Sequence, residues 1–497
     1  MQLIDRGNQA RRIREQLGPP VIDADGHWLE PGELFIDYVT EMAGDKAAAD
    51  VLAHFERIDV WYKTEPRQRM AQRLVRPGWW TEPADTYDRA TAMLPALMRN
   101  RLDDLGIDVG IIYPSLGMLL PGIRDAELRR SAIRAYNAMT ADQFAPHRDR
   151  LLPVAMVSAH TPQEAVEHVT HVVRDLGFRA ILIGSMVYRN IDGSGDPKAV
   201  TAHGARSGGY YIDALAIDSD HDYDPLWRAC IDLKVAVSAH SGGYGWPDRQ
   251  SPTNYVYNHV GHFAAANDAF CKAMVMGGVM RRFPRLNVAF LEGGVAWAAK
   301  LYTDIRSHWN TRNTGALLRN LDPTRLDLSQ LRQFVDAYGD TRVRAVADRL
   351  MANPCSVRLR KSAQDLHGRD ADVSDDFAAS GIDDPSRLPE IFGRCFFGCE
   401  ADDISVPWAY DKALGTRLQP MFGSDIGHFD VPDMAGVLGE AYELLDEGRM
   451  DAAQFREFSY LNVAKLHTRM NPQFFSGTRV EREVTRDLAA MNMQQQS

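Results

Sequence analysis

Eight short apolar runs recur along the chain, and they constrain its fold more than any other feature. Several are followed by segments with helical periodicity, such as 161–177 and 434–448. Near-continuous apolar runs are typical of strands that are buried on both faces of a parallel sheet. Eight such strands with helical crossovers predict a (β/α)8 TIM barrel rather than an open doubly wound sheet. The runs are 21–27, 109–115, 151–158, 179–185, 235–240, 287–293, 394–400 and 420–426.

Three segments do not fit the alternation of strand and helix. We expect long insertions at about 31–100, 186–225 and 301–390, helical apart from the second, within a single barrel domain that spans 1–497. The segment 186–225 is rich in glycine, and we expect it to be a loop. Long loops in a compact domain are more often functional or disordered than idle.

Each apolar run ends in a polar residue. In a barrel the carboxyl ends of the strands surround one mouth, where the active site is built. Five of these eight residues can bind a metal or carry a proton, which predicts a metal-dependent active site. The strand-end residues are His27, Ser115, Ser158, Ser185, His240, Glu292, Glu400 and Asp425.

The first, fifth and eighth strands carry the principal candidate ligands. Asp25 and His27 are two positions apart on one strand, so their side chains point to the same face. His240 and Asp425 end two other strands. This mixed nitrogen and oxygen set suits zinc, iron or manganese better than calcium. Any one of the four could simply cap a turn, but four at matching strand ends favour a metal site.

Further candidates surround this set. A carboxylate at Glu292, in FLEGG, is costly to bury without a cation, so we favour a direct or bridging metal ligand over a salt bridge. His259 and His262 share a helix face at a spacing of three residues. They either fold over the mouth as ligands, or cap and pack the helix, with about equal weight. Glu30 either caps the turn after the first strand or reaches the metal.

Two residues are candidate catalytic groups. His428 lies three positions after Asp425, and it is a candidate proton carrier or a partner that orients a ligand. Glu400, in FGCEADD, is a candidate catalytic acid of the seventh strand or an ion-pair partner.

The motifs DADGHWLEP and FGSDIGHFDVPD, together with His240, resemble the amidohydrolase superfamily. More narrowly, they resemble the amidohydrolase-2 group, which includes aminocarboxymuconate-semialdehyde and resorcylate-type decarboxylases. The resemblance covers most of the chain and implies a metal-dependent barrel in which Asp25, His27, His240 and Asp425 are ligands. Asp25 stands where the group usually has a histidine, and Glu292 replaces a sixth-strand histidine of many members. No lysine ends the fourth strand.

The two carboxylate replacements favour iron or manganese over zinc. The chain also resembles, in length and layout, the nonheme diiron monooxygenase type of platensimycin-like diterpenoid biosynthesis. That resemblance implies two iron ions that activate O2 and hydroxylate a bulky apolar acid or acyl thioester, in a pocket shaped by Trp79, Trp80 and Trp246. The alternative is a hydrolase or decarboxylase that uses one zinc or manganese ion on a carboxylate or amide substrate. The third hypothesis is a barrel without enzymatic activity that only serves as a scaffold for a partner, and we rank it below the other two.

Bulk properties limit the partners. A net charge of −11 gives nucleic acid binding no electrostatic support. No apolar run approaches the roughly 20 residues of a membrane helix, and the first 20 residues carry charges where a signal peptide needs its apolar segment. Five cysteines without zinc-type spacing fit thiols in a reducing cytoplasm. We therefore expect a cytoplasmic enzyme with a small-molecule substrate, O2 if it is an oxygenase, and a possible homodimer.

Overall fold

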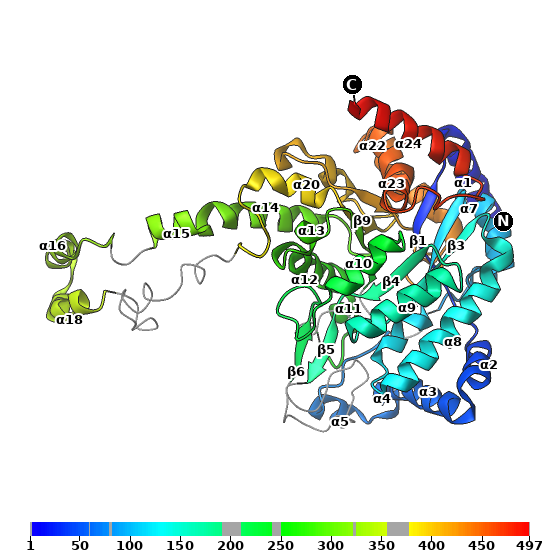
Figure 1. Ribbon diagram of the computed structural model, residues 1–497, viewed down its shortest axis with the longest axis horizontal. Helices are drawn as coiled ribbons and strands as arrows, with labels where there is room; N and C mark the ends of the chain where they lie inside the picture. The colour runs from blue at the N-terminus through cyan, green and yellow to red at the C-terminus, as the bar shows by residue number, and fades with distance from the viewer. Residues whose placement is uncertain are drawn as a thin grey trace. The chain divides into compact units, whose positions relative to one another are not determined.

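The computed structural model describes most of the chain, in two compact units (Figure 1). One unit comprises Met1–Leu301 with Pro389–Ser497, and the other comprises Tyr302–Leu388. The described residues are 2–58, 60–78, 82–190, 210–240, 250–321, 325–354 and 377–496.

The eight predicted strands form one parallel sheet in the first unit, which confirms the barrel prediction (Figure 1). Almost every strand residue is buried, as expected of strands covered on both faces. The order is β1-β2-β3-β4-β7-β8-β9-β10. The strands are β1 (Ile22–Trp28), β2 (Val109–Pro114), β3 (Leu151–Val157), β4 (Ala180–Gly184), β7 (Val237–His240), β8 (Val288–Phe290), β9 (Cys395–Cys399) and β10 (Pro420–Phe422).

The first strand meets the segment that follows the last strand at a seam, where the barrel is nearly closed. The Asp425 backbone N–H donates to the Asp25 carbonyl at 2.9 Å, and the His27 N–H donates to the Ile426 carbonyl at 2.8 Å. The Ser424 hydroxyl and backbone N–H both donate to the fully buried Asp23 carboxylate, at 2.5 and 2.9 Å. The seam therefore joins the two segments that carry Asp25 and Asp425.

Helices connect the strands, as the periodicity predicts. In α9 (Pro162–Arg174) the Thr161 hydroxyl accepts a hydrogen bond from the Glu164 N–H at 3.2 Å, and Pro162 occupies the first turn. Gly177 follows the helix with φ +70°, a conformation that favours glycine. α8 (Ala126–Phe144) and α9 both contact β3 (Figure 1). α12 (His262–Met276) contacts β7.

The insertion after β1 is helical, as predicted. It consists of α2 (Gly32–Ala43), α3 (Asp45–Ile58), α4 (Val60–Lys63), α5 (Pro66–Ala71), α6 (Thr86–Met93) and α7 (Pro95–Leu105).

The insertion after β4 contains an antiparallel ribbon where a loop was expected. Its strands are β5 (Val187–Asn190) and β6 (Tyr210–Asp213). The Arg189 guanidinium pairs with the buried Asp213 carboxylate at 2.9 Å and donates to the His160 carbonyl at 2.7 Å, which anchors the ribbon to the loop after β3. The rest of the glycine-rich stretch lies outside the described residues.

The second unit is largely helical where it is described, as predicted for 301–390. It contains the end of α14 (Ala296–Arg312), then α15 (Thr314–Asn320), α16 (Leu328–Tyr338), α17 (Thr341–Ala345) and α18 (Ala347–Ala352). That the whole chain is a single domain remains a prediction. Within the described ranges, no helix has the length and apolar character needed to cross a membrane.

Candidate metal centre

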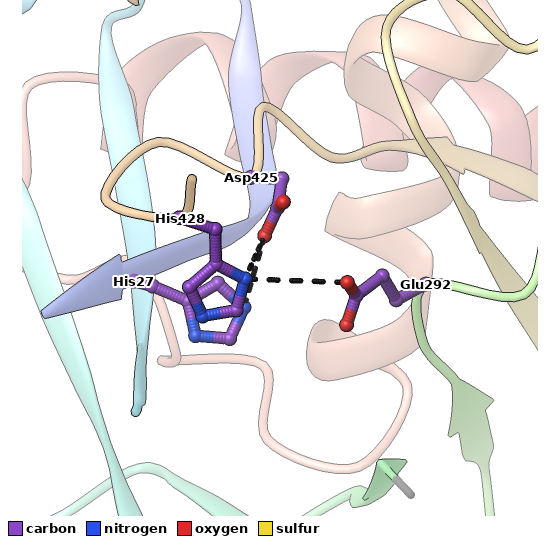
Figure 2. A group of neighbouring side chains, drawn as sticks. All are labelled: His27, Glu292, Asp425 and His428. Atoms are coloured by element: carbon purple, nitrogen blue, oxygen red, sulfur yellow. Dashed lines mark ion pairs between the residues drawn. The ribbon is translucent and has the colours of Figure 1, made fainter. Parts of the chain in front are cut away.

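The carboxyl ends of the strands bring together two groups of potential metal ligands. The first group is His27, Glu292, Asp425 and His428, and the second is Asp25, His27 and His240. Within each group, one ligand atom per residue lies within 4.8 Å of those of the other members. His27 belongs to both groups, so the two groups overlap at one imidazole. Figure 2 shows the first group.

The His27 imidazole is oriented by the neighbouring strand. Its Nδ1 lies 3.1 Å from the carbonyl of Pro114, the last residue of β2, to which it can only donate. Its Nε2 then carries the lone pair, and it lies 3.5 Å from Asp25 Oδ1 and 3.4 Å from Asp425 Oδ1. Burial lowers the pKa of His27 well below its usual value, so the imidazole is neutral. A buried lone pair between two carboxylates is suited to a cation.

Three buried carboxylates face this imidazole, from Asp25, Glu292 and Asp425. Burial is the main cause that raises the pKa of each well above its usual range, and the Glu292 charge raises those of Asp25 and Asp425 further. Carboxylates that are this costly to ionise without a partner are stabilised by a divalent cation. The donor set therefore fits a metal.

The backbone is strained at two of these carboxylates. Glu292 has φ +55° and Asp425 has φ +49°, in the left-handed region that non-glycine residues seldom adopt. Gly427, with φ +103°, lies so close to β1 that a Cβ there would be 2.7 Å from the His27 carbonyl oxygen. Strain of this kind is concentrated at functional sites. Here it occurs where the chain turns from β8 and from β10 into the mouth.

Two further imidazoles complete the centre. His240 Nε2 lies 2.5 Å from Glu292 Oε2. His428 Nδ1 lies 2.7 Å from Asp425 Oδ1 and 4.0 Å from Glu292 Oε1, and its ring stacks on that of His27 at 3.7 Å between centroids (Figure 2). Burial lowers the pKa of His428 to about 4. His428 is therefore neutral at neutral pH, and one of its ring nitrogens carries a lone pair.

A cavity of about 590 Å³ opens beside the centre. Glu292 lines it together with Glu400, which follows β9. Burial, with a smaller contribution from the Glu292 charge, raises the pKa of Glu400 to about 8. Glu400 is therefore largely protonated at neutral pH and can donate a proton into the cavity.

The sequence that carries the first six strands of the barrel identifies the family. The amidohydrolase family model matches residues 22–353. The chain belongs to the amidohydrolase family. It is a metal-dependent enzyme with the amidohydrolase fold, and the groups of ligand atoms described above could hold its metal.

Solved structures similar to this amidohydrolase have low sequence identity. An amidohydrolase of Mycobacterium avium subsp. paratuberculosis is 15% identical with a TM-score of 0.50, over 90% of this chain and 99% of that one. The 5-carboxyvanillate decarboxylase of Novosphingobium aromaticivorans, in complex with manganese and a nitrobenzoic acid, is 13% identical with a TM-score of 0.46, over 91% and 97%. A dihydroxybenzoic acid decarboxylase of Polaromonas with bound manganese is 12% identical with a TM-score of 0.43, over 90% and 97%. The first of these likenesses supports the barrel fold.

Three predicted ligands of the amidohydrolase lie outside both ligand groups. The Glu30 carboxylate accepts hydrogen bonds from the backbone N–H groups of Ser115, Leu116 and Gly117 at 3.0, 2.8 and 3.3 Å, and from the Tyr136 hydroxyl at 2.7 Å. Glu30 therefore holds the loop after β2. The two predicted roles were a cap of the turn after the first strand and a metal ligand. The hydrogen bonds give Glu30 a capping role, but on the loop after the second strand.

His259 and His262 stand at the side of the cavity. His259 ends α11 (Tyr255–His259) and lines the cavity, and His262 begins α12. The His262 Nδ1 lies 2.6 Å from the His259 carbonyl oxygen, so it donates a hydrogen bond to the backbone. Their role as ligands remains a prediction. Trp79, Trp80 and Trp246 lie outside the described residues.

Sequence reasoning missed the role of Asp23 in the amidohydrolase. This residue does not face the cavity; it accepts hydrogen bonds from Ser424 and from the Asp25 N–H at 3.1 Å, and it thereby fixes the ligand-bearing turn after β10 against β1. The motif DADGH contains Asp23, but nothing in the sequence links it to Ser424, which lies 401 positions away. Asp402, Asp403 and Asp430, which line the cavity, were also missed.

Proposed function

We propose that the chain is a one-metal hydrolase or decarboxylase with Asp25, His27, His240 and Asp425 as ligands and Glu292 as a further ligand. One observation carries this proposal: both ligand groups depend on His27, whose Nδ1 is committed to the Pro114 carbonyl. Its Nε2 can bind a single ion, so the two groups describe one metal position seen from two sides. The mixed nitrogen and oxygen donors suit manganese or zinc.

The bound ion would acidify a water molecule or polarise a substrate carbonyl. His428 is the group that would accept the proton from that water, because it is neutral and Asp425 orients its Nδ1 from 2.7 Å. Glu400 would return a proton from the other side of the cavity. In hydrolysis the water oxygen bonds to the substrate carbon, the bond to the leaving group breaks, and Glu400 protonates that group. In decarboxylation a carbon–carbon bond breaks, CO2 leaves, and Glu400 protonates the remaining carbon.

The two-iron oxygenase receives no support from the comparisons above. It would need a second ion held by Glu292, Asp425 and His428 without His27. The number of ions per chain therefore separates the two functions.

The decisive experiment is the metal content of the full-length protein, purified without added metal and after loading with manganese or zinc. We expect about one ion per chain, since a two-metal site would give about two. His27→Ala should lose the ion, whereas the control His171→Ala, on the outer helix α9, should keep it. Glu292→Gln should retain about one ion with reduced affinity. About two ions in the wild type, falling to about one in Glu292→Gln, would refute the proposal.

Activity is then sought with the loaded enzyme. Release of CO2 from aromatic acids and hydrolysis of amides, esters and lactones are the two screens. Glu400→Gln should lower kcat at least about 100-fold, as expected for loss of a general acid. Its metal content should not change.

A further inference from the structure

The cavity beside the metal centre has two chemically different walls. One wall consists of the loops after β8, β9 and β10, and it carries the side chains of Glu292, Glu400, Asp402, Asp403 and Asp430. Much of the remaining lining is apolar or aromatic, and it comes from α11, the start of α12 and Phe429 in the loop after β10. Such a cavity can distinguish the two ends of a substrate.

The acidic wall is more negative than a single divalent ion can neutralise. Three ligand carboxylates, from Asp25, Glu292 and Asp425, already exceed the charge of one such ion. Asp402 and Asp430 at the exposed rim of the cavity add further negative charge, and so does the half-buried Asp403. Among the described residues that line the cavity, none is a lysine or an arginine. A cleft lined by one sign of charge attracts the opposite sign and repels its own.

The acidic residues are not scattered surface charges, because they line one cavity together with the apolar and aromatic residues of α11 and α12. Glu292, which is 7% exposed, forms the inner end of the cavity at the metal centre. In the same lining, the Tyr255 and Phe429 rings lie 5.9 Å apart, and the Phe263 ring lies 5.8 Å from the His259 ring. Aromatic faces attract organic cations, and they do so more strongly when carboxylates lie beside them.

We infer that this cavity selects substrates that carry an organic cation, such as a protonated amine, on an apolar body. The inference rests on the proposed function, because it names the substrate class of the same site. The aromatic residues of the lining hold the apolar body, and the rim of Asp402 and Asp430 holds the cation while the reacting carbonyl faces the metal centre at Glu292. A free acid would meet repulsion from the same rim. Of the two proposed reactions, hydrolysis therefore suits the cavity better.

The test is calorimetric titration of the full-length, manganese-loaded protein with three probes of similar shape. These are phenethylamine, phenethyl alcohol and hydrocinnamate, which are cationic, neutral and anionic at neutral pH. The variants are Asp402→Asn, Asp430→Asn and the double variant, and Asp446→Asn on α21 (Val437–Asp446) is the matched control, because it is exposed and does not line the cavity. Metal content is measured on every sample.

We expect the amine to bind more tightly than the alcohol, and the acid to bind most weakly. Each single variant should weaken amine binding about threefold and the double variant about tenfold, the range typical of exposed charge pairs. Alcohol binding should not change, and the control should behave as the wild type. Raising the salt concentration should reduce only the preference for the amine.

Two results would overturn the inference. One is that hydrocinnamate binds as tightly as the amine, and the other is that the double variant keeps the wild-type affinity for the amine. Either result with about one ion per chain leaves the proposed function intact. Failure of the proposed function would instead appear in the metal content, and the order of the three probes in metal-free protein would still test the cavity.

Discussion

His467 should make the protein unstable in mild acid. It lies in α23 (Asn462–Thr468) and is 1% exposed, and its ring stacks on Phe474 at 3.9 Å between centroids. Neither ring nitrogen has a hydrogen-bond partner within the described ranges. Burial lowers its pKa to about 3, against an ordinary value of 6.5. Protonation is therefore favoured in the unfolded chain and resisted in the folded one.

The magnitude follows from this difference in pKa. Because the folded-state pKa is depressed, the unfolded chain binds one more proton as the pH falls from 6.5 towards 3, and stability is lost over that window. A pH of about 5 lies about 1.5 units below the ordinary pKa of the imidazole. The free energy of unfolding at this pH should therefore be about 2 kcal/mol lower than at a pH of about 7.5. His467→Leu, which cannot be protonated, should lose about 2 kcal/mol less than the wild type between the two pH values.

The assay is urea unfolding of metal-free wild type and His467→Leu at both pH values. Metal-free protein is used because acid also protonates the ligands of the centre and thereby releases the metal. The control His221→Leu removes a partly exposed imidazole and should show the wild-type loss. All other titrating groups are shared and cancel in the comparison. Equal losses in wild type and His467→Leu would refute the reasoning.

Three further predictions concern the supports of the metal centre. Ser424→Ala should lower the free energy of unfolding by about 1.5–3 kcal/mol, because it removes a hydrogen bond to the buried Asp23 carboxylate; an unchanged urea midpoint would contradict this. Gly427→Ala should reduce metal affinity at least about tenfold, because its Cβ would push against the backbone carbonyl of His27 and displace this ligand. Competition with a chelator measures the affinity. Glu30→Gln should destabilise the protein by about 1–3 kcal/mol and keep about one ion per chain; loss of the ion would instead make Glu30 a ligand.

The strands and their polar ends could be predicted from the sequence because both signals are local. A run such as 179–185 is apolar whatever lies beside it, and the buried β4 forms there. That His27, His240 and Asp425 come together could be predicted from position alone, since parallel strands place their carboxyl ends at one mouth.

The remaining features depend on contacts that no local pattern encodes. Glu30 looked like a possible ligand because it is an acid near His27, yet its oxygens accept hydrogen bonds from the loop after β2, whose position is set by the fold. The left-handed turns at Glu292 and Asp425 were hidden because neither residue is a glycine. The ribbon of β5 and β6 was hidden because its two short strands flank a glycine-rich stretch.

The seam between β1 and the turn after β10 has a consequence for how the enzyme is made. Asp25 leaves the ribosome early and Asp425 late, and the two meet only when the last strand docks against the first. With the ligands proposed above, a nascent or truncated chain that lacks β10 has no complete metal site. We therefore expect metal uptake to be a late event, and the bound ion would tie the two ends of the barrel together and oppose departure of its last strand.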